Sequence, residues 1–519
     1  MAGNLLLTNG TIYPGPPWQA PLSALAIRDG KVAARDAAAE RLRGRFAGEE
    51  VLDLRGAVVL PGFVDSHLHL LQLGEALGQV TFHESAAPDI IRQQVADAVK
   101  NRQPGEWITG GQWSRDALGG LPSRALLDPV SPENPVALHS KDLHTLLLNT
   151  CALKELDITG DTPDPSGGLI PRDREGQPTG ILREHAIRLF ESRRPVPDDA
   201  TFQRRYQLAN RYCLRRGITT VHTIESLAGW DRLRAFAGQD SPGVRTGGLL
   251  LLQDVDRIID RGYASGDGDD RRWIIGIKIF ADGALGSRSA WLKEPYAGNG
   301  DRGMPLLSPG ELTAAVERAH RHGLSVGIHA IGDAAVESAI EALAANRRPE
   351  YRDRIEHVQL IDPKDLSRIS PGIVASVQPV HLPGDRKPAE KYWGDRARYA
   401  YAFRSLREHG MLLAFGSDAP VEDANPWAGI QAAVERRASP DQTAWYPEES
   451  VSLDDALTAY TENGGRAAYR EDRIGGLRMG AHGDAVVLDR NPWEVPAGEL
   501  GDIKPQITIV AGEIVHTHE

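Results

Sequence analysis

The chain has 519 residues, of which 41% are hydrophobic and 25% are charged, which is typical of a soluble globular protein. Its formal net charge of −12 argues against nucleic acid or an anionic membrane as the main partner, because binding phosphates requires a basic face. The two cysteines, Cys151 and Cys213, exclude a disulfide framework and argue against a cysteine-based zinc site. No signal peptide or long apolar segment is evident, so we expect a cytoplasmic protein without membrane spans.

Both ends of the chain carry the pattern of short strands joined by turns. Residues 5–13 place the turn signal Thr-Asn-Gly between two apolar stretches, and residues 484–489 and 507–515 repeat this pattern near the C-terminus. Isolated hairpins are only marginally stable in water. We therefore predict one small β-sandwich assembled from residues 1–58 and 472–519.

The middle of the chain alternates apolar strands with amphipathic helices. The eight candidate strands are residues 57–65, 218–224, 244–252, 274–280, 325–330, 355–360, 372–378 and 412–416. Helical patterns follow several of them, at residues 309–322, 333–345, 395–409 and 453–469. Near-continuous apolar strands alternating with helices indicate a parallel sheet covered on both faces. We predict an α/β fold, a closed (β/α)₈ TIM barrel over residues 59–471, with an open doubly wound sheet as the alternative.

One long gap interrupts the alternation. About 150 residues separate the first two barrel strands, more than a loop of a compact domain spans. We interpret residues 80–200 as a subdomain inserted after barrel strand 1. Such a subdomain could cap the catalytic end of the barrel and select the substrate.

A pair of histidines, His67 and His69, stands at the end of the first barrel strand. Functional groups of a TIM barrel collect at the C-terminal ends of its strands. Side chains alternate along an extended strand, so both imidazoles point the same way, into the barrel mouth. Two imidazoles on one face can bind one metal ion. The pair alone is only suggestive, because chance His-x-His pairs occur.

A lysine, Lys278, lies among isoleucines in the fourth strand. Its neighbours Ile277 and Ile279 would face the helices, which turns Lys278 toward the barrel interior. A bare buried ammonium is costly, and metal cations would repel it. Two alternatives stay open: the side chain reaches outward to solvent, or it reacts with carbon dioxide to form an anionic carbamate that can bridge two metals.

Three further strand ends carry a potential ligand. His329 ends the fifth strand, His357 the sixth, and Asp418 follows the eighth. Any one of them could be an ordinary loop residue, but their joint occurrence at strand ends predicts a metal site. Imidazole and carboxylate ligands suit zinc and its neighbours better than calcium or magnesium.

The ordered set His67-x-His69, Lys278, His329, His357 and Asp418 resembles the amidohydrolase superfamily with a binuclear metal centre. More narrowly, the chain resembles the YtcJ-like, amidohydrolase-3 group, which includes N-substituted formamide deformylases. The matching stretches are residues 60–69, 278–290, 329–333, 355–357, 416–421, 461–465 and 480–488, together with 111–114, 121–124, 164–170 and 176–180 in the insertion. Two stretches depart from the group: Gln112-Trp113-Ser114 often reads Gly-Trp-Asp, and Asp142-Leu143-His144 often reads Asp-Gly-His. These departures leave the substrate open.

The resemblance implies a metal-dependent hydrolase that cleaves a non-peptide, amide-type C–N bond of a small molecule through a metal-bridged hydroxide. It implies two divalent ions, with zinc expected. His67 and His69 with Asp418 would hold the buried ion, His329 and His357 the exposed ion, and a carbamylated Lys278 would bridge them. Asp418 would also act as general base and acid.

Several features stay open at this point. Trp113, His144 and Arg288 are candidate substrate contacts, although each could equally have a structural role. The same site could hydrolyse an ester, lactone or phosphoester, or act as a lyase or isomerase. A non-catalytic scaffold is the weakest alternative, since every ligand position is filled. Homodimers are common in the superfamily, and the oligomeric state is not fixed by the sequence.

Overall fold

The computed structural model describes residues 3–45, 48, 50–83, 85–115, 117–141, 144–236, 243–298, 300–437, 439 and 441–518. The chain divides into two compact units, here called the barrel unit (Met1–Leu71 with Ala209–Glu519) and the inserted unit (Gln72–Leu208). Among the described residues, no helix is long and apolar enough to cross a membrane.

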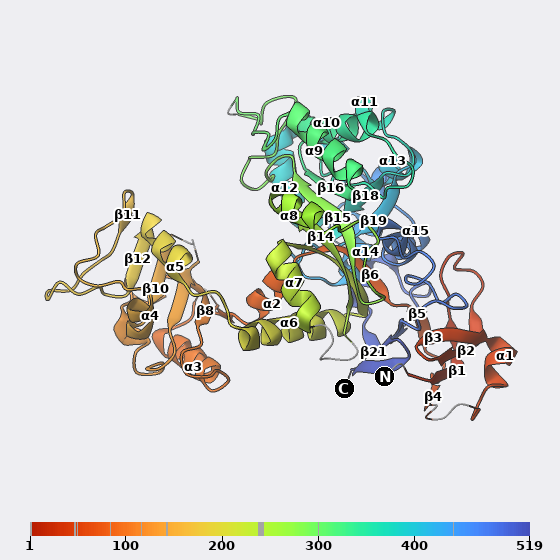
Figure 1. The fold of residues 1–519 in the computed structure, drawn as a ribbon, viewed down its shortest axis with the longest axis horizontal. Helices are drawn as coiled ribbons and strands as arrows, with labels where there is room; N and C mark the ends of the chain where they lie inside the picture. The colour runs from red at the N-terminus through yellow and green to blue at the C-terminus, as the bar shows by residue number, and fades with distance from the viewer. Residues whose placement is uncertain are drawn as a thin grey trace. The chain divides into compact units, whose positions relative to one another are not determined.

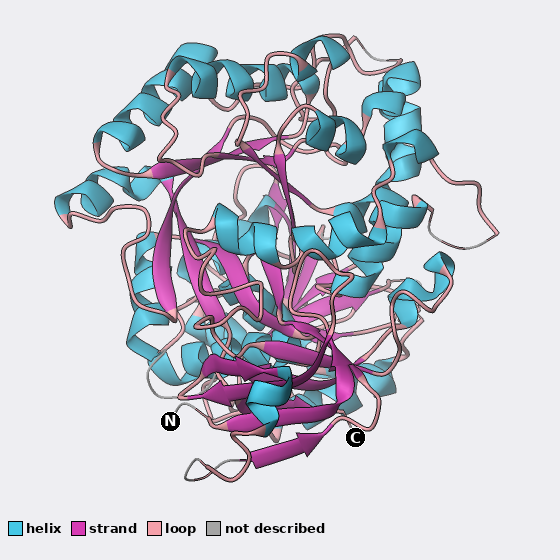
Figure 2. Cartoon of the chain, turned by 90° about the vertical axis from the view of Figure 1, so that its right-hand side faces the viewer, coloured by secondary structure: helices cyan, strands magenta, loops and turns pink. Residues whose placement is uncertain are grey.

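The barrel unit is built around a parallel sheet, whose eight strands in the described part of the chain follow one another in sequence order. They are β6 (Phe63–Leu68), β13 (Ile218–Glu225), β14 (Arg245–Leu251), β15 (Arg272–Phe280), β16 (Ser325–Ala330), β17 (Arg354–His357), β18 (Val374–Val377) and β19 (Leu412–Phe415). The backbone amides of Ser417 and Asp418 donate to the carbonyl of His67, at 3.2 and 2.7 Å, which joins the last strand to the first. The predicted TIM barrel is confirmed, and Figure 2 shows helices around its strands.

The helices of the barrel unit pack outside these strands. Their bounds are α7 (Leu227–Phe236), α8 (Val255–Asp260), α9 (Pro309–Arg321), α10 (Asp333–Ala345), α11 (Pro363–Leu366), α12 (Leu382–Trp393), α13 (Phe403–Glu408), α14 (Pro426–Glu435), α15 (Leu453–Ala459) and α16 (Glu462–Ala467). The helices α2 (Leu70–Leu77) and α6 (Asp199–Leu214) lie where the chain enters and leaves the inserted unit. A capping box between Ser308 and Glu311 begins α9 where the sequence predicts a helix start.

Two of the predicted helices are wrong in their extent. The helix predicted over residues 453–469 is divided into α15 and α16, because the Thr461 hydroxyl donates to the Leu457 carbonyl at 2.6 Å and Thr461 leaves the helical conformation. The helix predicted over residues 395–409 begins as a 3₁₀ segment, Gly394–Tyr399. Its extended residue Ala400 then pairs with Leu360 before α13 starts.

Both termini contribute to one sheet, here called the terminal sheet. The strand order is β22 (Glu513–Thr517), β21 (Pro505–Val510), β20 (Ala485–Leu488), β5 (Val58–Pro61), β1 (Leu5–Ile12), β2 (Leu22–Arg28) and β3 (Lys31–Arg35), with β4 (Glu50–Asp53) beside β1 and the short helix α1 (Asp36–Glu40) after β3. In Figure 1, β21 from the C-terminal end of the chain and β1–β5 from the N-terminal end belong to this sheet. Leucine, isoleucine and valine side chains from both ends of the chain fill one core beneath it.

The prediction of a single strand over residues 57–65 is wrong. Val58–Pro61 pairs with β1 and β20 in the terminal sheet, whereas Phe63–Leu68 pairs with β13 in the barrel. Gly62 joins the two, and a Cβ there would lie 2.2 Å from the Thr219 hydroxyl. Only glycine lets the chain pass this closely from one sheet to the other.

The inserted unit has a sheet of its own. Its order is β11 (Gly168–Leu169), β12 (Ile181–Glu184), β10 (Thr145–Leu148), β9 (Val136–Ser140), β8 (Ile108–Trp113) and β7 (Val80–Thr81), with helices α3 (Pro88–Val99), α4 (Thr150–Glu155) and α5 (Arg188–Arg193) (Figure 1). Successive residues along its strands, such as Leu146 and Leu147, belong to two different buried clusters. Both faces of the sheet are therefore covered, and the unit has its own core. Its predicted role as a cap stays a prediction.

Candidate metal centre

The predicted ligands His67 and His69 lie beside Asp418 at the C-terminal end of the barrel. The Nε2 atoms of His67 and His69 lie 3.3 and 3.2 Å from the same Asp418 oxygen, Oδ1. His67 is almost fully buried, whereas His69 keeps 19% of its side-chain exposure and lies nearer the solvent. Three ligand atoms from opposite ends of the barrel sequence thus converge on one point.

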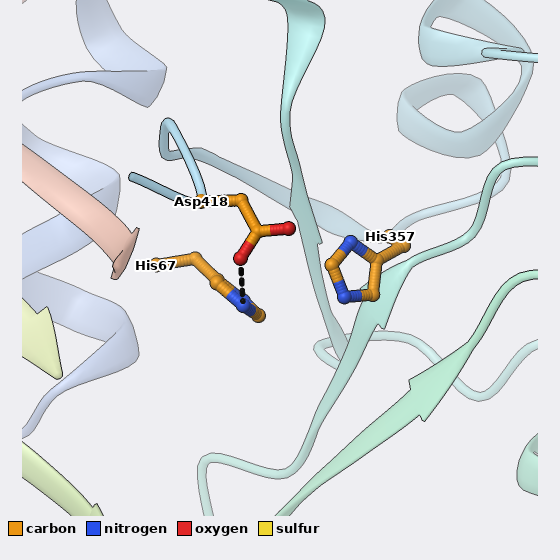
Figure 3. Close-up of side chains that lie close together, drawn as sticks. All are labelled: His67, His357 and Asp418. Atoms are coloured by element: carbon orange, nitrogen blue, oxygen red, sulfur yellow. Dashed lines mark ion pairs between the residues drawn. The ribbon is translucent and has the colours of Figure 1, made fainter. Parts of the chain in front are cut away.

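His357 completes the group from the end of β17. The ligand atoms of His67, His357 and Asp418 all lie within 4.8 Å of one another. Figure 3 shows the three side chains close together. His357 and Asp418 adopt positive φ angles of 73° and 61°. Such backbone strain costs on the order of 1–3 kcal/mol per residue and is commonly found at functional sites. The surrounding fold therefore holds these two ligands in place against a local backbone preference.

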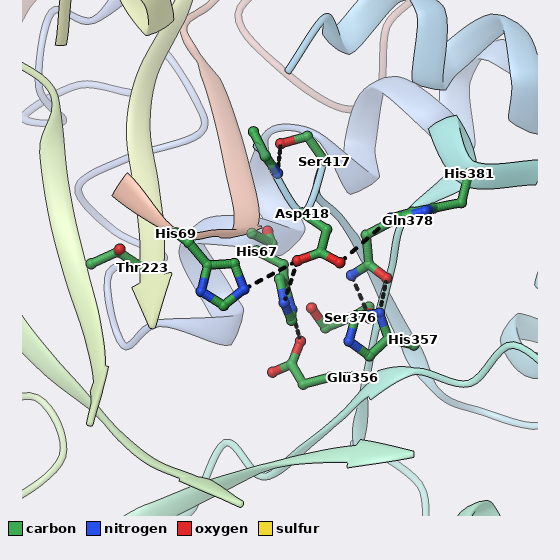
Figure 4. A network of polar contacts seen from close by, with 12 residues as sticks. His67, His69, Thr223, Glu356, His357, Ser376, Gln378, His381, Ser417 and Asp418 are labelled. Atoms are coloured by element: carbon green, nitrogen blue, oxygen red, sulfur yellow. Dashed lines mark hydrogen bonds and ion pairs between the residues drawn. The ribbon is translucent and has the colours of Figure 1, made fainter. Parts of the chain in front are cut away.

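The hydrogen bonds at Nδ1 of His357 and His67 determine which ring nitrogen remains available to a metal. His357 Nδ1 donates to the amide oxygen of Gln378 at 2.7 Å, and His67 Nδ1 donates to the carboxylate of Glu356 at 2.5 Å. Figure 4 shows Glu356 beside His67 and Gln378 beside His357. Each bond leaves Nε2 as the free lone pair, which is the arrangement that metal-binding histidines require.

His329 lies next to this group. Its ring centroid is 4.6 Å from that of His357. Its Nε2 donates to the carbonyl of Gly283 at 2.9 Å and lies 3.5 Å from the Asp282 carboxylate. Nδ1 is therefore the nitrogen that remains for a metal. The structure places all four predicted histidines around the barrel mouth, with His69 and His329 outside the tightest group.

Lys278 lies inside the barrel, as its alternation with isoleucines predicts. Its side chain is 1% exposed, so it does not reach outward to solvent. Among the described residues, its Nζ has no hydrogen-bond partner. Burial lowers the pKa of Lys278 to about 8, so a neutral, nucleophilic amine is accessible near neutral pH. The outward-turned alternative is excluded.

The charges around the site are arranged to suit a cation. Burial alone would raise the pKa of Asp418, but the neighbouring imidazoles of His381, His67 and His69 hold it well below its ordinary value. Burial lowers the pKa of His357 well below its usual range, and that of His329 to about 3. The centre therefore offers a carboxylate and neutral imidazoles, the protonation states that bind zinc.

His67 is the exception among the histidines. Burial and the charge of Lys278 would lower its pKa, but the carboxylates of Glu356 and Asp418 raise it above its ordinary value. A positive charge at His67 Nε2 is thus favourable, whether a proton or a metal ion supplies it. The orphaned Lys278 amine, the convergent ligand atoms and this demand for a cation together fit a metal centre.

Several residues of the site were not singled out from the sequence. Glu356, Arg354, Gln378, His381 and Asp282 contact the predicted ligands directly or through one neighbour. A signal was present for the first two, because charged residues at i and i+2 in a strand otherwise buried in apolar surroundings imply an interior ion pair. Gln378 and His381 follow β18, where the sequence predicts no ligand.

The three predicted substrate contacts lie in different surroundings. Trp113 is 1% exposed and its indole N–H donates to the Leu138 carbonyl at 2.8 Å, which favours the structural role. His144 is exposed and pairs with Glu184 at 2.9 Å, beside a cavity of about 740 Å³ in the inserted unit. Its neighbours Asp142 and Leu143 lie outside the described residues.

Arg288, the third predicted contact, belongs to the barrel unit. It is exposed in the segment after β15, with a positive φ of 55°, and its guanidinium lies 5.7 Å from the ring centroid of Tyr392. This segment follows Lys278 directly, so Arg288 lies on the chain that leaves the catalytic end of the barrel.

A closed parallel barrel with imidazoles and a carboxylate at its C-terminal mouth defines a metal-dependent barrel enzyme. The chain matches the amidohydrolase family over residues 50–516 and belongs to that family. The protein LONG AFTER FAR-RED 3 of Arabidopsis thaliana is 36% identical, over 95% of this chain and 88% of its own. The N-substituted formamide deformylase of Arthrobacter pascens is 28% identical, over 98% and 97%.

A solved structure shares the whole architecture. An uncharacterized metal-dependent hydrolase from Pyrococcus furiosus is 30% identical with a TM-score of 0.80, covering 95% of this chain and all of its own. The predicted membership of the amidohydrolase-3 group is therefore confirmed, and the protein is a hydrolase of a metal-dependent family.

Proposed function

We propose that this protein hydrolyses a non-peptide, amide-type C–N bond of a small molecule at a zinc centre in the barrel mouth. The convergence of His67 Nε2 and His69 Nε2 on Asp418 Oδ1, at 3.3 and 3.2 Å, carries the proposal. The name of the Arthrobacter relative, N-substituted formamide deformylase, supports the choice of bond.

Two divalent ions fit the donor set best in this proposal. His67, His69 and Asp418 would hold one ion, and His329 and His357 the other. A carbamate on Lys278 would bridge them, which would give its unpartnered Nζ a role. Bound zinc lowers the pKa of water toward neutrality and polarises a carbonyl oxygen.

Asp418 is the proposed proton carrier. Its carboxylate stays ionised at neutral pH, because His381, His67 and His69 hold its pKa low. Oδ1 is directed to the two histidines, and Oδ2 lies on the other side, 3.6 Å from His381 Nε2. Oδ2 would accept the proton of the attacking water and deliver it to the leaving nitrogen, which needs protonation to depart as an amine.

A substrate screen in labelled water tests the proposal. Zinc-loaded protein is incubated with N-alkylformamides, N-acyl amino acids and cyclic amides in H₂¹⁸O, with esters and lactones alongside, and products are identified by mass. We expect an acid carrying one ¹⁸O together with the free amine. Turnover of esters or lactones alone, or rearranged products without label, would overturn the assignment of the bond.

A further inference from the structure

Two oppositely charged side chains, Arg354 and Glu356, lie wholly inside the barrel. They stand two residues apart on β17, so both point to the interior, and both side chains are 0% exposed. A buried charge without a partner strongly destabilises the folded state. Their presence next to a metal centre therefore calls for a physical reason.

Arg354 connects several neighbouring strands in the barrel interior. Its guanidinium lies 2.6 Å from Glu356 Oε1 and 3.1 Å from His222 Nδ1 on β13. It also donates to the carbonyl of Ser66 on β6 and to the hydroxyl of Ser376 on β18. Contacts to strands on several sides leave the guanidinium, and with it the Glu356 carboxylate, one position.

Glu356 uses its other oxygen to reach the metal centre. Oε2 accepts the hydrogen of His67 Nδ1 at 2.5 Å. The neighbouring ligand His357 has only a neutral amide, that of Gln378, in the corresponding place. A carboxylate that accepts the N–H of one ring nitrogen fixes the tautomer and the orientation of the imidazole. It also makes the opposite ring nitrogen a stronger ligand for a metal ion.

We propose that Glu356, held by Arg354, is a positioning residue that fixes His67 with Nε2 toward the metal and gives the His67 position the tighter metal binding. This inference rests on the proposed function, since it presupposes a metal at His67. Arg354 keeps Glu356 immobile, and the contact with His67 passes that constraint to the ligand.

The experiment compares zinc affinity among three variants, measured by competition of the metal-free protein with a chromophoric chelator. E356Q keeps the shape but removes the charge. E356D keeps the charge opposite Arg354 but withdraws the carboxylate from His67 Nδ1. D484N is the matched control, because Asp484 also forms a buried ion pair, at 2.6 Å with Arg245, which begins β14 and lies away from the metal centre.

We expect both Glu356 variants to weaken the tightest zinc site by about 10- to 100-fold. The absorption spectrum of cobalt bound at that site should change as well. D484N should lower the melting temperature without altering zinc affinity or the cobalt spectrum. If E356Q does not fold, E356D decides, because the charge balance around Arg354 is kept.

The outcomes separate the two claims. A wild-type protein that binds no zinc would overturn the proposed function. A wild-type protein that binds zinc, with a folded Glu356 variant of equal affinity, would overturn the positioning role alone. An equal loss of affinity in D484N would also overturn it, because the effect would then follow general stability.

Discussion

The barrel unit and the inserted unit differ in the burial and the partners of the residues that the sequence predicts to have a function. In the barrel, the candidate ligands are buried or half-buried at strand ends, and partners such as Glu356 and Gln378 fix their orientation. In the inserted unit, Trp113 belongs to the hydrophobic core and His144 is exposed beside Glu184. The candidate ligands are thus held on a rigid scaffold, and we propose that the features that choose a substrate lie on surfaces that can vary.

The largest expected effect is that of D418N. The variant should lower kcat by on the order of 10³-fold or more, because an amide cannot accept the proton at Oδ2. Zinc content should persist through the histidines. D365N is the control, since Asp365 is also buried but pairs with Lys293 on the outside of the barrel. Activity that survives D418N would contradict the role given to Asp418.

The next effect compares two buried histidines within the barrel unit. H357N should weaken zinc binding by more than about 100-fold, because a direct ligand is lost. H320N should leave zinc binding unchanged and lower only the melting temperature, because His320 bonds to Asp353 and to the Asn346 carbonyl, each at 3.0 Å. Zinc titrations of both variants measure this difference. Equal losses of zinc affinity would contradict the role of His357 as a direct ligand.

A smaller effect is expected in the inserted unit. H144A should raise KM about tenfold, which corresponds to about 1.4 kcal/mol, without changing kcat or zinc content. H409A is the control, because His409 is an exposed histidine of the barrel unit. Steady-state kinetics with the best substrate of the screen measure this. An unchanged KM would remove His144 from the substrate contacts.

The last expected effect concerns stability and not function, at Glu225, a buried carboxyl at the end of β13. Burial raises its pKa to about 7. As pH rises from about 4.5 to 7, the unfolded chain loses this proton while the folded chain keeps it, so the free energy of unfolding decreases. E225Q removes that cost and should be more stable than wild type at pH 8, by about 3 kcal/mol at most.

Urea denaturation at pH 5 and pH 8 measures this difference. The gap between E225Q and wild type should widen at the higher pH. The amide oxygen can still accept from the Thr223 hydroxyl and the Leu71 amide, as Glu225 does. A gap that is constant with pH would mean that Glu225 is ionised in the folded protein.

Much of this architecture could be predicted because it depends on local patterns. The alternation of strands and helices predicts the barrel, and strand periodicity places His67 and Lys278 inside it. The split at Gly62 could not be predicted, because the apolar run from Val58 to Val64 passes through Gly62 without a break, and β5 and β6 are separated by their partners, β20 and β13. Such partners are distant in the sequence.

The same reason explains what was missed in the site. Glu356 reaches His67 across 289 positions of the chain, so no local pattern connects the two. Gln378 likewise acts through His357 rather than through a motif of its own. Ligands follow strand ends, which periodicity predicts, whereas the residues that orient the ligands depend on which strands become neighbours.

Zinc content measured together with activity tests the central claim most directly. Wild-type protein is loaded with zinc, dialysed exhaustively and analysed for metal, beside the variant H67A/H69A. The account predicts up to two zinc ions per wild-type chain, a clear loss in the variant, and amide hydrolysis that a chelator stops and zinc restores. A wild-type protein without bound zinc, or hydrolysis that the chelator leaves untouched, would contradict it.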